Sequence, residues 1–165
     1  MNLHMPQDEE SEAELKNLAA VPYQIISPAN NASIVGVFQD SLLGAYRFTR
    51  PDIKFNQLDA MNLLMSFNKI NTSALKKSKE ITSFEIMSQI MPPLTMKFGN
   101  KWFEDSGEEY SKSNHVVEIV AGKYVRGQME KSVLGSGGNG LLQRVCNYFG
   151  NMAAADFVDN LQNVV

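Results

Sequence analysis

Apolar and polar residues alternate over the first residues of the chain, MNLHMP. Leu3 and Met5 fall on one side of an extended backbone, and Asn2 and His4 fall on the other. A repeat of two residues is typical of a β-strand, so we predict a strand over residues 1–6. A strand normally follows a segment that turns the chain into a sheet, so the pattern raises the question whether this stretch is a true N-terminus or the middle of a longer chain.

Further along, apolar residues recur every three or four positions, which is the spacing of one face of a helix. The predicted helices lie within residues 9–19, 35–50, 56–67, 82–91, 141–149 and 151–165. Several of these stretches begin with a side chain that can accept a hydrogen bond from a free backbone N–H group. The predicted N-caps are Asp8, Asn56, Thr82 in a capping box with Glu85, and Asn151.

The remaining stretches carry strand and turn signals. Residues 115–127 predict a β-hairpin that turns at Ala121 and Gly122. Residues 21–33 contain two prolines and paired asparagines, which indicate an extended segment rich in turns. Residues 99–114 are polar and predict a surface excursion. Together these elements predict an α+β fold, a mixed α/β domain of short strands, a β-hairpin and several amphipathic helices.

The composition describes one domain with enough apolar material for a core. The chain has 165 residues, of which 44% are hydrophobic and 20% are charged, as in ordinary globular domains. The formal net charge is -3, and the densest basic stretch, LKKSKE at residues 75–80, is interpreted as a solvated segment. Free-standing nucleic-acid-binding domains carry a basic face, so the charge argues against unspecific electrostatic binding to DNA.

Cysteine usage and hydropathy constrain the compartment. The single cysteine, Cys146, excludes an intramolecular disulfide and a zinc site built from several cysteines. This usage fits a reducing, intracellular environment. The sequence has no apolar run of the roughly 20 residues that a membrane helix needs, and its start lacks the features of a signal peptide. We therefore expect neither a membrane nor secretion.

Motif by motif, the residues describe no self-contained active site. The stretch GSGGNG at residues 135–140 precedes a helix, whose N-terminal N–H groups could hold a phosphate. It lacks the Lys-Ser or Lys-Thr of a P-loop, so a structural turn is favoured over a phosphate cradle. His4 and His115 are the only histidines and lack a metal-ligand spacing, and no GxSxG motif is present. An independent hydrolase or metalloenzyme therefore has little support.

Several longer strings carry a family resemblance. Residues 1–50, with MNLHMPQ, ISPAN and QDSLLG, resemble the largest subunit of multisubunit DNA-directed RNA polymerases, the β′ subunit of bacteria. Residues 117–165, with GKYVRGQMEKSVLG and GLLQRVCNYFGNMAAADFVDNLQNVV, resemble the same subunit. The form is more similar to eukaryotic, archaeal and large-DNA-virus polymerases than to bacterial ones. The resemblance is weak over residues 51–79 and 99–114.

The resemblance implies a pore domain, also called domain 3, over residues 1–165. In the family, the strand written here as MNLHMPQ follows the loop NADFDGDE and lies at the edge of the active-site domain. The C-terminal helix leads toward the funnel. The implied function is transcription of DNA into RNA by the assembled enzyme, a nucleotidyltransferase. Within it, this segment lines the secondary channel for nucleotide entry and for backtracked RNA.

One departure from the family limits what the chain can do alone. The three aspartates of DFDGD, which hold the catalytic magnesium in the family, are not in this sequence. Phosphoryl transfer of this kind depends on metal ions. We therefore expect magnesium in the assembled polymerase, with ligands outside this chain, and no catalytic residue and no activity here. The alternative is a stand-alone binding or regulatory module derived from the polymerase.

Five residues are candidates for the site that the resemblance implies. Asn2 and His4 would stand next to the metal-binding loop, where His4 either hydrogen-bonds that loop or anchors its own strand. Gln39 and Asp40 match a polar pair of the family and would lie near the channel, with a structural role as the alternative. Lys131 matches a lysine of the family, and its ammonium could meet the phosphate of a nucleotide or of backtracked RNA.

The resemblance also implies partners and a location. The remainder of the largest subunit and the second-largest subunit would surround this segment. DNA, RNA and nucleoside triphosphates would be bound in the complex, and a transcript-cleavage factor is a further candidate partner. The location would be intracellular, in the nucleus or in a cytoplasmic viral factory.

Overall fold

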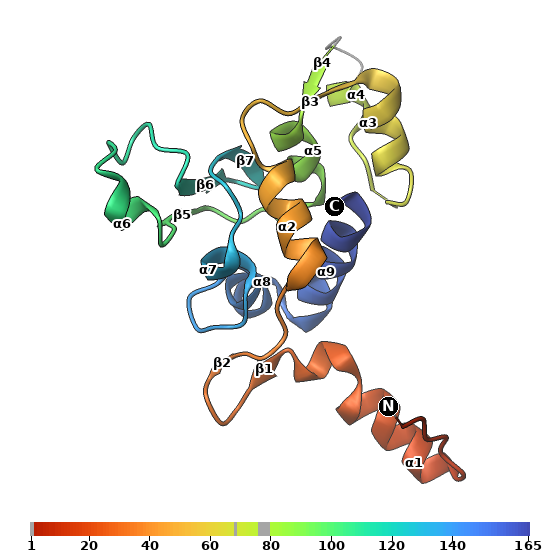
Figure 1. Cartoon of the computed structure of the whole chain (residues 1–165). Coiled ribbons are helices and arrows are strands. Elements are labelled where there is room, and N and C mark those ends of the chain that lie inside the picture. Colours follow the sequence, from red (N-terminus) through yellow and green to blue (C-terminus); the bar gives the residue numbers. More distant parts are fainter. Residues whose placement is uncertain (1, 68, 76–79) are drawn as a thin grey trace.

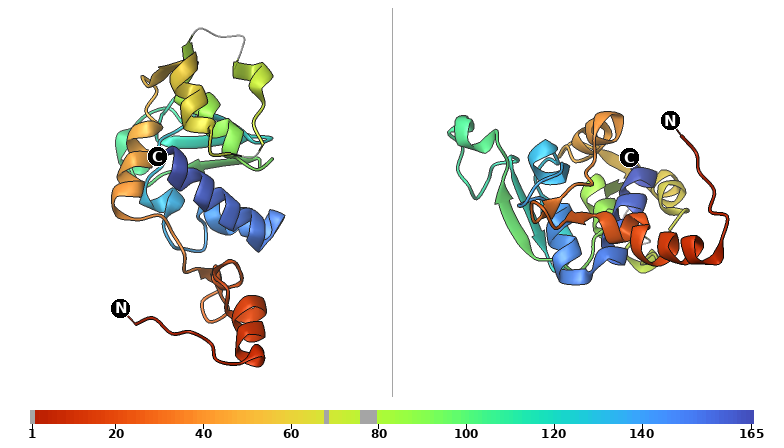
Figure 2. Two further views of the ribbon diagram at one scale, coloured as in Figure 1. Left: turned by 90° about the vertical axis from the view of Figure 1, so that its right-hand side faces the viewer. Right: turned by 90° about the horizontal axis from the view of Figure 1, so that it is seen from below.

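The computed structural model describes residues 2–67, 69–75 and 80–165. Residues 25–165 form a body in which helices pack on one another and on a small sheet, and residues 2–24 form an N-terminal arm (Figure 1). The arm extends away from the body in Figure 1 and in the left view of Figure 2, which is perpendicular to it. None of its residues is buried, so the core belongs to the body.

The predicted strand over residues 1–6 is wrong for the described residues, because residues 2–7 form no regular secondary structure. Extended backbone is held as a strand only by hydrogen bonds to a neighbour, and no described strand pairs with this stretch. The predicted helix over residues 9–19 is present as α1 (Glu9–Glu14), which continues into the π-helix η1 (Leu15–Ala19). Asp8 caps it by accepting a 2.7 Å hydrogen bond from the Ser11 N–H.

The turn-rich segment leads from the arm into the body. It contains the 3₁₀-helix η2 (Val21–Gln24) and the two short antiparallel strands β1 (Ile26–Ser27) and β2 (Ala32–Ser33). Helix η2 packs on α9 (Asn151–Val164). The arm therefore contacts the body at the last helix.

Three of the four predicted helix N-caps are present in the structure. In sequence, the helices that follow the arm and precede the main sheet are α2 (Gln39–Phe48), α3 (Gln57–Leu64), α4 (Thr72–Leu75) and α5 (Ser83–Ile90). The same part of the chain contains β3 (Lys54–Asn56), which pairs antiparallel with β4 (Glu80–Thr82). Asn56 accepts from the Asp59 N–H at 2.8 Å. Thr82 and Glu85 form the predicted capping box. The first three predicted caps are therefore confirmed.

The fourth predicted cap, Asn151, is wrong. The residue at the N-cap of α9 is Gly150, and its φ of 88° turns the chain sharply after α8 (Leu141–Phe149). A left-handed φ favours glycine. The Asn151 side chain instead accepts a 2.9 Å hydrogen bond from the Cys146 thiol.

The main sheet has three antiparallel strands in the order β5 (Met96–Gly99), β6 (Val116–Val120) and β7 (Lys123–Arg126). Strands β6 and β7 are the predicted hairpin, and Ala121 and Gly122 form its turn with positive φ angles. Strand β5 was not predicted. Helix α5 covers β7, where the Ser88 hydroxyl accepts from the Tyr124 N–H at 2.9 Å.

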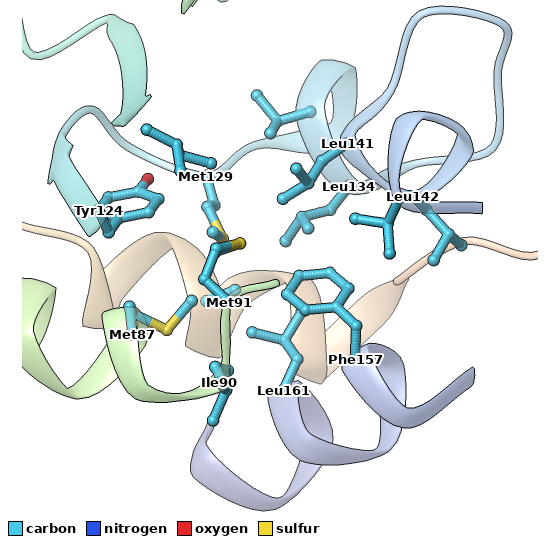
Figure 3. Close-up of a cluster of buried hydrophobic side chains, with 14 of the residues drawn as sticks. Met87, Ile90, Met91, Tyr124, Met129, Leu134, Leu141, Leu142, Phe157 and Leu161 are labelled. Carbon is cyan, nitrogen blue, oxygen red and sulfur yellow. The ribbon is translucent and has the colours of Figure 1, made fainter. Parts of the chain in front are cut away.

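A buried cluster joins the sheet to the helices (Figure 3). Side chains from α5, β7, α8 and α9 meet there, together with α7 (Lys131–Leu134). Its labelled members are Met87, Ile90, Met91, Tyr124, Met129, Leu134, Leu141, Leu142, Phe157 and Leu161. Burial raises the pKa of the Tyr124 phenol, which donates to the Gly127 carbonyl at 2.8 Å. The combination of helices with small antiparallel sheets confirms the α+β fold class.

Candidate functional site

A cleft lies between two loops of the body, one before α6 (Phe103–Ser106) and one around α7. Helix α6 belongs to the excursion of residues 100–114, which joins β5 to β6 and extends from the edge of the body (Figure 1). The cleft has a volume of about 710 Å³. Its lining residues are Lys101, Trp102, Glu104, Asp105, Glu130, Lys131, Ser132 and Ser136. We call it the α6–α7 cleft.

One carboxylate holds the two walls of the α6–α7 cleft together. Glu130 accepts a 2.8 Å hydrogen bond from the Lys101 backbone N–H on one wall. It also accepts from the Ser132 hydroxyl at 2.5 Å on the other wall. Hydrogen bonds to a charged acceptor are stronger than those between neutral groups, so Glu130 fixes the spacing of the walls.

The base of the excursion is fixed at the end of β5. Asn100 is buried, and its side-chain oxygen accepts from the Trp102 and Phe103 N–H groups at 3.1 and 3.2 Å. Its own N–H donates to the His115 carbonyl at 2.8 Å. The backbone that carries Trp102 is therefore attached to the sheet.

The far end of the excursion is held by Arg126. Its guanidinium donates to the carbonyls of Ser113 and Tyr110 at 2.8 and 2.9 Å and to the Glu118 carboxylate at 2.8 Å. The same hydrogen bond from Arg126 lowers the pKa of Glu118 from its ordinary value of 4.5. These bonds anchor the excursion to β6 and β7.

The glycine-rich loop packs closely against the segment before α2. The Val37 N–H donates to the Leu134 carbonyl at 2.9 Å. A Cβ atom at Gly36 would lie 2.5 Å from the Ser136 nitrogen, closer than real Cβ contacts come. Within the loop, a Cβ atom at Gly135 would lie even closer to the Lys131 carbonyl oxygen. Close packing therefore accounts for glycine at both positions, which favours the structural turn over the phosphate cradle for the loop.

The five predicted site residues fall into two groups. Asn2 and His4 are exposed on the N-terminal arm, which extends away from α6 and α7 (Figure 1). Gln39 and Asp40 are exposed in the first turn of α2, just after the segment that bonds to the end of α7. Lys131 is exposed in the cleft itself. Of the five residues, only Lys131 lines the α6–α7 cleft, and the role of every one of them stays a prediction.

Of the lining residues, sequence reasoning selected only Lys131, and the missed ones include Lys101 and Trp102. Both fall in the stretch that was interpreted only as a surface excursion. The available signal was that Trp102 is the single tryptophan of the chain and stands in a polar segment. Its side chain is 63% exposed, which is high for so large an apolar group.

The described residues contain neither a metal-binding cluster nor a membrane-spanning helix. No group of three His, Cys, Asp or Glu side chains in residues 2–67, 69–75 and 80–165 could hold a metal ion. The residues present therefore do not fit the magnesium site of the family. No described helix has the length and hydropathy to cross a membrane. The core of the basic stretch, residues 76–79, lies outside the described residues.

Comparison with known proteins gives one consistent result. The family RNA polymerase Rpb1, domain 3 matches residues 24–165. DNA-directed RNA polymerase subunit 1 of Acanthamoeba polyphaga mimivirus is 27% identical over 168 residues, which cover 100% of this chain and 10% of that protein. Subunits RPB1-A and RPB1-B of DNA-directed RNA polymerase II of Trypanosoma brucei brucei are each 28% identical over 167 residues, or 99% of this chain and 9% of each relative.

Since the match covers most of the sequence, this chain belongs to the family RNA polymerase Rpb1, domain 3. The predicted resemblance to the largest subunit, in its viral and eukaryotic form, is confirmed. The chain spans about a tenth of the length of the curated relatives it matches. Residues 1–23 precede the family match but align with the relatives.

Proposed function

We propose that this chain works as the pore region of a DNA-directed RNA polymerase, with the α6–α7 cleft facing the channel for nucleotides and backtracked RNA. The observation that carries the proposal is the position of Lys131, the residue that the resemblance selected. Lys131 is exposed and lines the α6–α7 cleft, and Lys101 lines the same cleft from the other loop. An exposed ammonium beside a channel attracts phosphate as a mobile point charge. Gln39 and Asp40 would add polar groups beside the same region.

The test is a polymerase that carries Lys131→Gln, compared with one that carries Lys123→Gln. Lys123 is also an exposed lysine, but it lies on β7 outside the α6–α7 cleft. Removing one exposed positive charge that contacts a phosphate weakens the interaction by about 1 kcal/mol. This corresponds to a roughly fivefold loss of rate or affinity. We expect slower cleavage of backtracked transcripts only with Lys131→Gln. Equal effects of the two variants would contradict a channel role.

In this proposal the chemistry belongs to the assembled enzyme, and the isolated chain is inactive. The metal that activates nucleotides would be held by the remainder of the largest subunit, since the described residues do not fit it. Asn2 and His4 would lie next to that metal-binding loop. A transcription assay on the purified chain, with and without magnesium, should give no RNA.

The N-terminal arm supports assembly with the rest of the largest subunit. Leu3, Met5, Leu15, Leu18 and Val21 on the arm are all exposed. A soluble domain seldom leaves so many large apolar side chains in water without a partner to cover them. The arm also precedes the family match. In this proposal the N-terminal stretch MNLHMPQ lies at the edge of the active-site domain. The C-terminal helix leads toward the funnel.

The wider partners follow from the same assignment. The second-largest subunit, DNA, RNA and nucleoside triphosphates would be met in the intracellular complex, and a transcript-cleavage factor would enter through the channel. A stand-alone module would have to protect its arm by itself. Hydrogen exchange that shows a protected arm in the isolated chain would therefore favour the module, and rapid exchange there favours the assembled polymerase.

A further inference from the structure

We propose that the α6–α7 cleft is a stacking site for one nucleobase, with the Trp102 indole as the platform and the Lys101 and Lys131 ammonium groups on the adjoining phosphate. The inference rests on the proposed function for RNA as the source of the nucleotide. It adds a residue, Trp102, from the stretch where the family resemblance is weak.

Trp102 has a fixed backbone and an available ring. Its N–H is bound by Asn100, and the neighbouring Lys101 N–H is bound by Glu130. The residue as a whole is 63% exposed, and within the described residues its ring forms no aromatic pair. The next aromatic side chain, Phe103, does pack, edge-on against Tyr110 with ring centres 5.2 Å apart. Phe103 therefore stabilises the excursion, whereas the Trp102 ring is available to a ligand.

The lysines of the cleft are placed on both walls. Within the described residues, neither the Lys101 nor the Lys131 ammonium forms an ion pair. Glu130 directs its carboxylate to the Lys101 backbone N–H and the Ser132 hydroxyl. Both ammonium groups therefore stay available for an anion that enters between the walls.

The acidic residues limit which anion fits. Glu104 and Asp105 line the α6 side of the cleft. They repel a continuous phosphate backbone, and the formal net charge of -3 adds to this effect. A volume of about 710 Å³ suits a ligand of nucleotide size. The combination favours a single unpaired nucleotide, such as an extruded RNA 3′ end, over a duplex or a long strand.

Stacking on an aromatic ring is the usual way in which proteins hold single bases. It is tolerant of sequence because every base has a π-face. An extruded RNA end has any sequence, so a stacking platform suits it better than a set of hydrogen bonds to base edges. The site would therefore discriminate little between the four bases.

The direct test uses the full chain, whose only tryptophan is Trp102. Titration with a 5′-phosphorylated RNA trinucleotide should quench the fluorescence of Trp102 in a saturable way. Calorimetry with the same probe compares the variants. We expect Trp102→Leu, which keeps apolar bulk but removes the ring, to weaken binding by about tenfold, in line with the loss of one stacked base. Trp102→Phe should retain part of the affinity.

Charge variants give the matched control. Lys131→Gln and Lys101→Gln should each weaken binding by about fivefold, whereas Lys123→Gln on β7 should have no effect. These side chains are exposed, and circular dichroism checks that each variant folds like the parent. Unchanged affinity in Trp102→Leu, or equal losses in Lys123→Gln and Lys131→Gln, would overturn the proposal. So would quenching by a basic peptide but not by the trinucleotide, since that result would assign the cleft to a protein partner.

A polymerase that carries Trp102→Leu separates this inference from the proposed function. If cleavage of backtracked RNA slows with both Trp102→Leu and Lys131→Gln, both stand. If only Lys131→Gln slows it, the stacking site is wrong and the channel role stands. If neither variant slows it, the channel role itself is wrong.

Discussion

The Thr49 hydroxyl accepts a 2.9 Å hydrogen bond from the backbone N–H of Met129, a residue 80 positions further along the chain. The same hydroxyl donates to the Ala45 carbonyl at 2.8 Å, and Thr49 is fully buried. It thereby ties the end of α2 to the segment that runs from β7 into α7.

Replacing Thr49 by Val should lower the free energy of unfolding by about 1–3 kcal/mol, because the buried Met129 N–H loses its only side-chain acceptor. Val keeps the size and branching of Thr, so little packing is lost. Thr49→Ser keeps the hydroxyl and removes a methyl group, and it should cost less. Denaturant unfolding of the two variants measures the difference. A smaller loss for Val than for Ser would show that packing, and not the hydrogen bond, is what Thr49 supplies.

The features that the sequence predicted are local ones. The side chains of Asp8, Asn56 and Thr82 each accept a hydrogen bond from a backbone N–H three residues ahead. Each cap therefore depends only on residues within one helical turn. The prediction of Asn151 as an N-cap was wrong because the sharp turn at Gly150 changes the path of the chain just before the helix.

Features that depend on contacts between residues far apart in the chain could not be predicted from local sequence patterns. Strand β5 has only four residues and is defined by its pairing with β6. The alternation at residues 1–6 predicted a strand, but no described strand pairs with residues 2–7. The α6–α7 cleft depends on the Glu130 contact with Lys101, 29 residues apart, which no local pattern contains. Lys131 was found only because the family resemblance pointed to it.

Gly36→Ala should destabilise the fold and disturb the rim of the α6–α7 cleft. A Cβ atom there would press on the Ser136 nitrogen and the Gly135 carbonyl carbon, which are backbone atoms and cannot move aside easily. Overpacking of this kind costs about 1–3 kcal/mol. Gly137→Ala is the control, since a Cβ atom at Gly137 would meet no atom within 4 Å. Thermal unfolding should separate the two variants, and equal midpoints would contradict close packing at Gly36.

Glu130→Ala should release the base of the excursion. The Lys101 N–H would lose its acceptor, so its hydrogen exchange should become about tenfold faster or more. Glu104→Ala removes a carboxylate from the same cleft, and in the described part of the chain the Glu104 side chain accepts no hydrogen bond. It should leave the Lys101 exchange rate unchanged. If both variants exchange at the parent rate, Glu130 does not hold the walls together.

The contact between Glu118 and Arg126 should make the excursion sensitive to acid. The Glu118 pKa lies below its ordinary value of 4.5, first because of the hydrogen bond from Arg126. A lowered folded-state pKa means that the charged carboxylate stabilises the fold above pH 4.5, and that this contribution is lost as the pH falls through the folded-state pKa. The difference in unfolding free energy between the parent chain and Glu118→Gln should therefore shrink from about pH 7 to about pH 3. The pKa values of Asp8 and Glu109 are lowered as well, but both proteins keep these groups, so they cancel in the difference. A difference that stays constant over this range would mean that the charge of Glu118 contributes nothing to the anchor of the excursion.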